Sequence, residues 1–262
     1  MWHRANDFIR SNIYVDNGQQ VPHKNAVQGY TFTHQERTLV TNELHVDASS
    51  YLYSGLVSFL DALQGLQAGF YSWPTVKLYY AIFYACRAYL AACNICLFYV
   101  GRSSYSVDLG VSVPPRSQGG NTHKAVLELF RTNCPGNVFL TQEIEMQDPF
   151  DWFTYKREYC NYKQPKFCEP NIPAHFEKLD SLGTDVCLND YYNDHNNYLA
   201  FDEDHAIIAY PFGILLNTID KFVQVGLEFD EPELRHLRSM IQSLNISETL
   251  FKIDFSAIDD DQ

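Results

Sequence analysis

The chain has 262 residues, of which 46% are hydrophobic and 19% charged, a composition that excludes an intrinsically disordered protein. Its 19 basic and 32 acidic residues give a formal net charge of −13. An autonomous DNA-binding domain is excluded, because binding to a phosphate backbone requires clustered lysine and arginine. The 7 cysteines are an odd number without a disulfide-type spacing, and the first residues contain no apolar run of signal-peptide length. We therefore expect a cytoplasmic protein.

Residues 1–46 are expected to form an N-terminal arm of irregular structure and short strands. β-branched and aromatic residues, which are typical of strands, cluster at residues 13–15, 30–33 and 38–41. A helix is expected to begin near Asp47, because the Asp-Ala-Ser-Ser run that starts there supplies capping side chains. Apolar residues at helical spacing extend this helix to about residues 65–69.

The longest helix is predicted from Ser72 to about Tyr99. Residues 76–100 are long enough to be tested as a membrane span, but Lys77 and Arg87 interrupt them. A charged Arg in mid-span is costly in lipid, so we expect a buried bundle helix and no membrane association.

A polar stripe follows one side of this predicted helix. Its members fall within about a 100° sector of the helix. They are Lys77, Tyr80, Tyr84, Arg87 and Asn94. Because buried polar groups need partners, the stripe predicts a hydrogen-bonded seam or a cleft between helices.

Four further helices are predicted, over residues 122–131, 148–162, 203–225 and 231–244. A loop or hairpin is expected at 101–120, and a long loop with a short helix near 175–179 is expected at 167–201. The acidic residues 259–261 are expected to be a disordered tail. We therefore predict a mainly α protein with three parts: the N-terminal arm 1–46, a helical bundle 47–166 and a C-terminal helical extension 167–262.

Three blocks of sequence, in this order, resemble the HEPN superfamily of small bacterial proteins. Residues 79–88 read Tyr-Tyr-Ala-Ile-Phe-Tyr-Ala-Cys-Arg-Ala, which is similar to the pattern of the family's second major helix. The second block begins at Thr122-His123, and the third runs from Arg157 to Asn161-Tyr162. The resemblance covers about residues 50–165 and implies a HEPN-like antiparallel helical bundle.

Many active members of this family are metal-independent endoribonucleases that work as dimers. Their motif pairs an Arg with a His about one helical turn later, so that the Arg binds phosphate and the His moves a proton from or to the ribose 2′-hydroxyl. Here Asn161 follows Arg157 at that spacing, and no His stands there. The resemblance implies a catalytic face of Arg157, Asn161 and Tyr162, without metal or cofactor. His123 is the candidate proton acceptor, because a helix N-terminus disfavours its charged form.

A small basic cluster lies at the end of the third block. Lys156, Lys163 and Lys166 interleave with tyrosines, and such a pattern can follow a single-stranded backbone and stack bases. Arg87, in the first block, is a further candidate RNA contact. A solvated basic turn at a helix C-terminus explains the lysines equally well.

Cys93 and Cys96 have the two-residue spacing of redox and zinc pairs, but no second ligand pair accompanies them. We interpret them as buried structural cysteines and expect no metal site.

The sequence leaves two functions open. The first is a HEPN-like endoribonuclease of a bacterial anti-phage defence or toxin–antitoxin system, acting on RNA. The second is a catalytically inactive accessory subunit that binds a partner protein, such as a nuclease or an ATPase, or a second copy of itself. The missing His and the net charge of −13 favour the second function, since an acidic surface suits a partner with a basic face.

Overall fold

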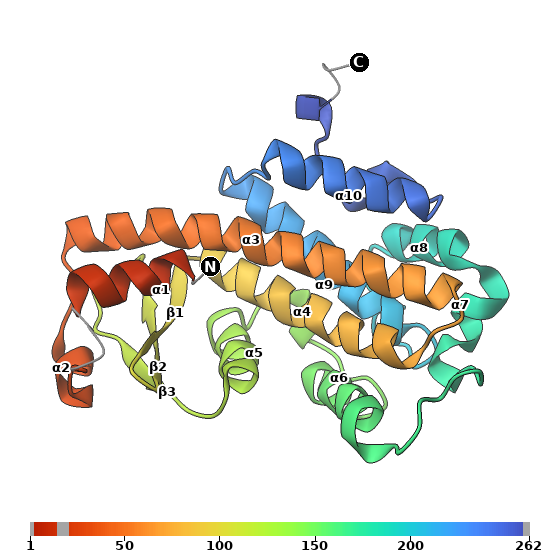
Figure 1. The fold of residues 1–262 in the computed structure, drawn as a ribbon, viewed down its shortest axis with the longest axis horizontal. Helices are drawn as coiled ribbons and strands as arrows, with labels where there is room; N and C mark the ends of the chain where they lie inside the picture. Colours follow the sequence, from red (N-terminus) through yellow and green to blue (C-terminus); the bar gives the residue numbers. More distant parts are fainter. Residues whose placement is uncertain (1–2, 15–20, 259–262) are drawn as a thin grey trace.

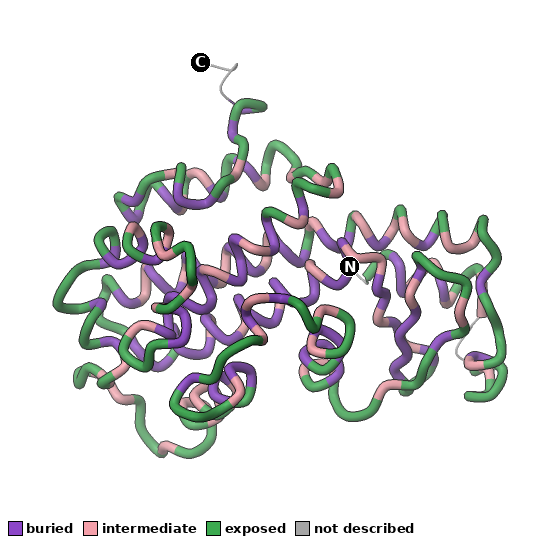
Figure 2. The backbone as a smooth tube through the Cα atoms, turned by 180° about the vertical axis from the view of Figure 1, so that it is seen from behind, coloured by how far each residue is buried: buried purple, intermediate pink, exposed green. Residues whose placement is uncertain are grey.

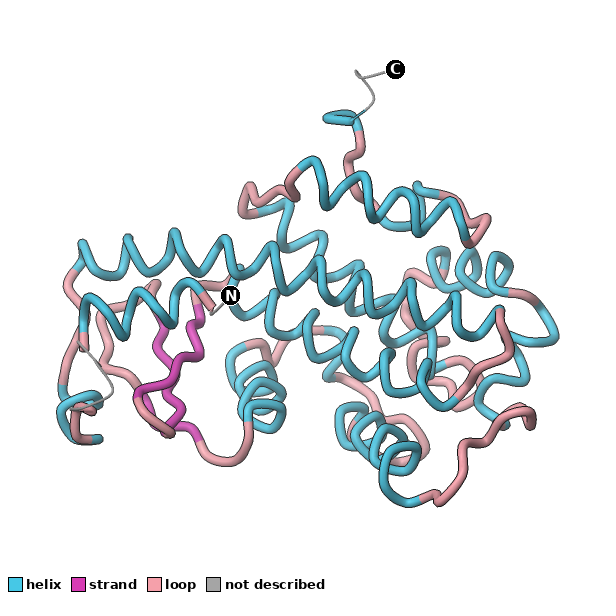
Figure 3. The backbone as a smooth tube through the Cα atoms, viewed as in Figure 1, coloured by secondary structure: helices cyan, strands magenta, loops and turns pink. Residues whose placement is uncertain are grey.

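A computed structural model describes residues 3–14 and 21–258 of the chain. Within these ranges the chain forms ten α-helices and one three-stranded sheet (Figures 1 and 3), so the predicted mainly α class is confirmed. Val15 of the first predicted strand and the predicted acidic tail at 259–261 lie outside the described residues.

Two long antiparallel helices, α3 (His34–Gln67) and α4 (Ser72–Ala92), form the centre of the fold (Figure 1). They approach closely at Gly55, where an added Cβ would lie 3.4 Å from the carbonyl oxygen of Ala81. The third central helix, α9 (Ala206–Gln224), packs against both of them. Figure 2 shows that the buried residues concentrate along these central helices.

Helix α9 is long and apolar enough to cross a membrane by length and composition alone. In this structure 72% of its apolar window is buried inside the protein, which is typical of a core helix. The segment singled out from the sequence, residues 76–100, is not one helix, because α4 ends at Ala92.

The predicted strands of the N-terminal arm are wrong for the described residues. The segment forms α1 (Arg4–Phe8), a π-helical turn (Ile9–Ile13) and α2 (Lys24–Gly29), and then enters α3 at His34. The helix expected from Asp47 therefore begins earlier, and residue 46 lies inside it.

A capping box at Thr33 explains this early start. The Thr33 hydroxyl accepts a hydrogen bond from Glu36 N at 3.2 Å, and the Glu36 carboxylate accepts one from Thr33 N at 2.8 Å. Val40 and Leu44 then fall on the buried face of α3, one turn apart. This helical spacing outweighs the strand propensity of residues 38–41.

Asp47 caps a different helix from the one predicted. Its carboxylate accepts hydrogen bonds from Arg4 N at 2.9 Å and from Ala5 N at 3.0 Å, at the first turn of α1. The predicted capping residue therefore joins α1 to α3, which are distant in sequence.

The sheet follows α4 and contradicts the prediction of helix up to Tyr99. Asn94 has a φ of 63°, which breaks the helix before residues rich in β-branched and aromatic side chains. Strands β1 (Ile95–Val100), β2 (Ser103–Asp108) and β3 (Arg116–Gln118) pair antiparallel in that order. Ile95 pairs with Asp108 and Ser106 with Arg116, so the predicted hairpin after residue 101 is confirmed.

Shorter helices surround the central three. They are α5 (Thr122–Asn133), α6 (Pro149–Glu158) with a π-helical continuation (Tyr159–Lys163), α7 (Glu177–Leu182), α8 (Thr184–Asn193) and α10 (Glu231–Ser243). Single 3₁₀ turns lie at Val138–Leu140, Ala174–Phe176, Glu248–Phe251 and Ser256–Ile258. Each of the four longer helices predicted after residue 120 is confirmed, and α7 matches the short helix expected near residues 175–179, whereas α8 lies in a segment that we expected to be a loop.

Glu169, from the segment after α6, caps the start of α4. Its carboxylate accepts hydrogen bonds from Tyr71 N at 2.6 Å, Ser72 N at 2.7 Å and Ser72 Oγ at 2.8 Å. Burial would raise the pKa of Glu169, but the backbone hydrogen bonds outweigh burial and lower the pKa to about 2.

We expect Glu169→Gln to lower the free energy of unfolding at pH 7 by about 1–2 kcal/mol, because the charged cap is lost. Since the folded pKa is lowered, the contribution of Glu169 is present above pH 4.5 and is lost as the pH falls towards 2. Urea denaturation of wild type and variant measures the difference, with Glu177→Gln at an exposed site as the matched control. Equal stability of Glu169→Gln and the control would contradict the cap.

Candidate functional site

Tyr79, in the middle of α4, joins two residues that the sequence singled out from separate helices. Its hydroxyl is hydrogen-bonded to Nδ1 of His123, from α5, at 3.0 Å. The guanidinium carbon of Arg157, from α6, lies 4.4 Å from the centroid of the Tyr79 ring. We call these three residues the Tyr79 cluster. It brings together the two candidate groups for phosphate binding and proton transfer.

His123 is held by the N-terminus of α5 and by rings of α4. Asn121 caps the helix by accepting a hydrogen bond from Lys124 N at 3.0 Å. The imidazole then packs 4.4 Å from the Phe83 ring and 5.5 Å from the Tyr80 ring, measured between centroids. Packing on two rings fixes the direction of the side chain.

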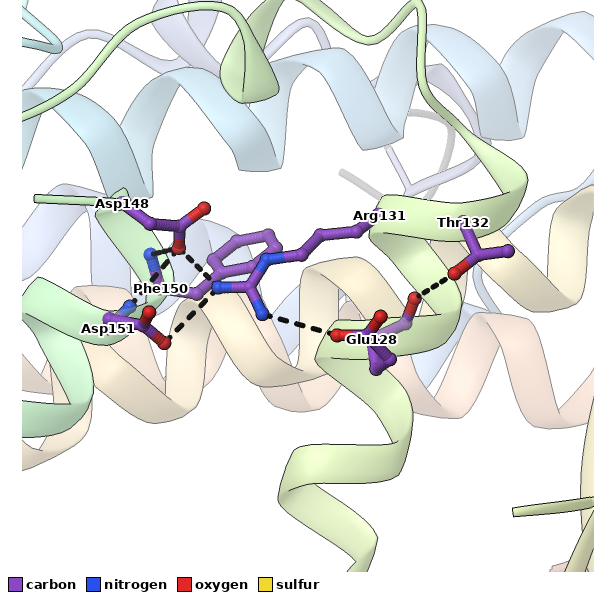
Figure 4. Close-up of polar contacts among 6 residues, drawn as sticks. All are labelled: Glu128, Arg131, Thr132, Asp148, Phe150 and Asp151. Carbon is purple, nitrogen blue, oxygen red and sulfur yellow. Dashed lines mark hydrogen bonds and ion pairs between the residues drawn. The ribbon is translucent and has the colours of Figure 1, made fainter. Parts of the chain in front are cut away.

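Arg131 connects the helices that carry His123 and Arg157 (Figure 4). From the last turn of α5 it forms ion pairs with Asp148 and with Asp151, at 3.2 Å for the latter. Asp148 is the N-cap of α6 and accepts a hydrogen bond from Phe150 N at 2.9 Å. The guanidinium carbon also lies 5.2 Å from the Phe150 ring centroid. This network sets the position of α6 relative to α5.

The protonation states in the Tyr79 cluster follow from burial and from two arginines. Burial lowers the pKa of His123, and the charges of Arg157 and Arg87 lower it further. Burial raises the pKa of Tyr79 to about 12, although Arg157 opposes this shift. At neutral pH the imidazole is therefore neutral and the phenol is protonated. The tautomer that donates from Nδ1 to Tyr79 leaves Nε2 free to accept a proton.

Arg157 retains unused hydrogen-bonding capacity. Its side chain is 16% exposed, and one terminal nitrogen lies 3.3 Å from the carboxylate of Glu158. The Nε atom is buried and has no hydrogen-bond partner among the described residues. A guanidinium with free donors suits an anionic group such as phosphate.

The other two candidate catalytic residues lie further along the same segment, in the π-helical continuation of α6. Asn161 is half-buried, and Tyr162 is 77% exposed. Among the described residues neither has a hydrogen bond or a ring contact with Tyr79 or His123. The structure therefore brings Arg157 and His123 to the same tyrosine, and Asn161 and Tyr162 take no part in that contact.

The predicted RNA-binding residues are in different environments. Lys156 lies over the Trp152 ring at 4.4 Å and near the Glu145 carboxylate at 4.0 Å, so its charge already has partners. Lys163 lies 4.5 Å from the Tyr155 ring centroid.

Lys166 is exposed, and Arg87 is buried against the Tyr51 ring of α3, at 4.2 Å from its centroid. Of the four predicted contacts, Lys163 and Lys166 are thus the most accessible to a ligand.

Three of the five residues in the polar stripe, Lys77, Arg87 and Asn94, have partners on α3. Lys77 forms an ion pair with Asp61 at 2.6 Å. Asn94, just beyond α4, is hydrogen-bonded to His45 at 3.0 Å. Arg87 stacks on Tyr51 of α3, whereas Tyr80 packs against His123 of α5, so part of the predicted seam lies between α4 and α3.

Tyr79 was not among the candidate site residues predicted from the sequence. It lies beside Tyr80 in the first of the three sequence blocks, but only Tyr80 falls within the sector of the helix that the polar stripe occupies. The sequence contained one available signal: Tyr79 begins the first of the three sequence blocks, and Arg157 begins the third.

Within the described residues, no group of three or more His, Cys, Asp or Glu side chains could hold a metal ion. Comparison with known proteins finds no matching family model, no matching curated protein and no matching solved structure.

Proposed function

We propose that this chain is a HEPN-like, metal-independent endoribonuclease that acts on RNA in the cytoplasm of a bacterium, within an anti-phage defence or toxin–antitoxin system. The observation that carries the proposal is the Tyr79 cluster, in which Arg157 and His123 contact the same tyrosine. The bacterial setting comes from the HEPN-like sequence blocks.

The cluster has the groups that cleavage at a ribose requires. Arg157 neutralises the phosphate, and the neutral imidazole of His123 accepts the proton of the attacking 2′-hydroxyl. Tyr79 orients the imidazole through Nδ1, as a carboxylate does in other His-based sites. In this proposal His123 replaces the His that the family's motif has one turn after the Arg.

The test is cleavage of single-stranded RNA in the presence of EDTA. We expect His123→Ala and Arg157→Ala each to lower the cleavage rate by about 100-fold, because the first removes a general base and the second removes the charge that stabilises the phosphate. Because the pKa of His123 is lowered below its usual value of 6.5, the wild-type rate should no longer rise with pH above 7.

Two exposed residues provide matched controls for the cleavage assay: His34→Ala on α3 and Arg116→Ala on β3. Both control variants should cleave RNA at the wild-type rate. Thermal melts of all four variants report whether a loss of activity follows from unfolding. Cleavage that requires a divalent metal, or that survives in both Tyr79-cluster variants, would contradict the proposal.

An exposed aromatic cluster favours a second candidate, a non-catalytic accessory subunit that binds a partner protein or a second copy of this chain. Trp73 and Phe167 are 52% and 53% exposed, and their ring centroids lie 6.0 Å apart. Phe70, which is 56% exposed, lies just before α4, the helix that contains Trp73. Aromatic residues are enriched at the centres of protein interfaces.

Light scattering tests the self-association form of this candidate. A wild-type dimer that becomes monomeric in Trp73→Ser, but not in Tyr198→Ser at another exposed site, would support it. A wild-type protein that is monomeric, cleaves RNA and binds neither a nuclease nor an ATPase would exclude the accessory role.

A further inference from the structure

Cys93 and Cys134 lie together at the surface, where the C-terminal ends of α4 and α5 meet. Each is the first residue after its helix. They line the same surface cavity of about 470 Å³, together with the exposed loop residues Pro135 and Gly136. Both cysteines are free and half-buried, and interaction between the two thiols is the largest cause of the pKa shift of each.

We propose that Cys93 and Cys134 form a reactive dithiol, which low-molecular-weight disulfides convert reversibly to an intramolecular disulfide. The observation that carries this proposal is that both cysteines, at the ends of two packed helices, line one cavity that a small molecule can enter. The proposal is independent of the proposed RNA cleavage, because neither cysteine belongs to the Tyr79 cluster.

The surroundings identify Cys93 as the attacking thiol. The hydrogen bond from Cys134 lowers the pKa of Cys93 to about 7, against the opposing effect of burial, and Lys221 of α9 adds to the lowering. The charge of Asp108 of β2 and the C-terminal dipole of α4 both oppose this lowering of the Cys93 pKa. The same hydrogen bond, with burial, raises the pKa of Cys134, so Cys134 keeps the proton of the pair. The thiolate is the nucleophile in thiol–disulfide exchange.

The reaction proceeds in two exchanges. The Cys93 thiolate attacks one sulfur of the external disulfide, whose S–S bond breaks as the first thiolate leaves and takes a proton from water. Cys134 then loses its proton to water and attacks Cys93 Sγ, which displaces the second external thiolate. The two cysteines lose two electrons in total, and the external disulfide gains them as it becomes two thiols.

The remaining cysteines are less suited to this reaction. Cys86, Cys96 and Cys187 are buried. Cys160 and Cys168 are half-buried, but burial raises the pKa of each thiol. A carboxylate oxygen of Glu169 also lies 3.7 Å from the Cys168 sulfur, which disfavours a thiolate there. Cys160 and Cys168 therefore provide internal controls in the same protein.

The experiment treats the full chain with glutathione disulfide at pH 7.5 and maps the products by peptide mass spectrometry. In wild type we expect a Cys93–Cys134 disulfide. In Cys134→Ser the reaction should stop at a glutathione adduct on Cys93. In Cys93→Ser the adduct on Cys134 should form at least about 10-fold more slowly than the Cys93 adduct does in Cys134→Ser. Cys168→Ser should react as wild type does.

Lys221→Met tests the electrostatic part of the proposal. It should slow the reaction of Cys93 by about 3-fold relative to Lys124→Met, an exposed control on α5, because a nearby positive charge stabilises the thiolate. The proposal is overturned if Cys160 and Cys168 form the first disulfide, or if Cys93 reacts no faster than Cys160. The proposal would also be overturned if Cys134 reacted with glutathione disulfide at the same rate in wild type and in Cys93→Ser.

Discussion

Gly213→Val should lower the free energy of unfolding by about 3 kcal/mol, because α9 has no room for a side chain at this position. An added Cβ would lie 2.6 Å from Cζ of Phe139, closer than non-bonded carbons approach. Phe139 cannot move aside, because it is 2% exposed and its ring lies against Phe201 and Tyr210. The Tyr210 hydroxyl also donates a hydrogen bond to the Phe139 carbonyl at 2.7 Å, which fixes the backbone there.

Chemical denaturation of the single and double variants checks this prediction. Gly29→Val, where nothing lies within 4 Å of an added Cβ, controls for the change of residue type in a helix. Phe139→Leu shortens the ring, so the double variant Gly213→Val with Phe139→Leu should recover part of the loss. Additive losses in the double variant would contradict the steric account.

The helices predicted correctly from the sequence are those whose buried residues recur at helical spacing. In α10, Leu234, Leu237 and Ile241 are buried and follow this period. Helix α5 shows the same pattern at Val126, Leu129 and Phe130. A helix with such a pattern can be predicted from its own residues, without the rest of the chain.

The secondary-structure predictions were wrong where packing against distant residues outweighs the local propensity of the sequence. The residues of the N-terminal arm have the composition of strands, but they form helices, of which α1 packs against α3 and β1. In α8, Cys187 and Tyr191 supply a buried face amid Asn and Asp residues, which made the segment resemble a loop. The end of α4 was predicted too late because Asn94 has a positive φ, which cannot be read from the sequence.

The candidate site was predicted in its parts but not in its arrangement. His123 and Arg157 were both selected from the sequence, yet their separation in the chain gives no indication that they contact the same residue. Tyr79 supplies that contact, and Arg131 fixes the two helices relative to each other through Asp148. Cys93 and Cys134 are equally distant in sequence, which is why their pairing was not predicted.

Half-buried His175, whose Nε2 atom is fully enclosed, should make the protein lose stability as the pH falls below 6.5. His175 lies in the 3₁₀ turn before α7, with its ring centroid 4.6 Å from that of Phe176. Its Nε2 atom is buried without a hydrogen-bond partner among the described residues. Burial, with a smaller contribution from the charge of Lys156, lowers the pKa of His175 to about 4.

The direction of the pH effect follows from which state takes up the proton. The unfolded chain protonates His175 near pH 6.5, whereas the folded protein does so only near pH 4, so protonation favours unfolding between these values. At about 1.4 kcal/mol per pH unit, His175 alone should lower the free energy of unfolding by about 2 kcal/mol between pH 6.5 and pH 5.

Urea denaturation across this pH range checks the prediction, by comparing wild type with His175→Gln. The variant should show a shallower loss of stability, because it lacks the titrating group. His34→Gln, at an exposed position, controls for the removal of a histidine as such. NMR titration of the His175 ring gives an independent measurement: a midpoint near 6.5 in the folded protein would contradict the prediction. An unchanged slope in His175→Gln would contradict the assignment of the loss to His175.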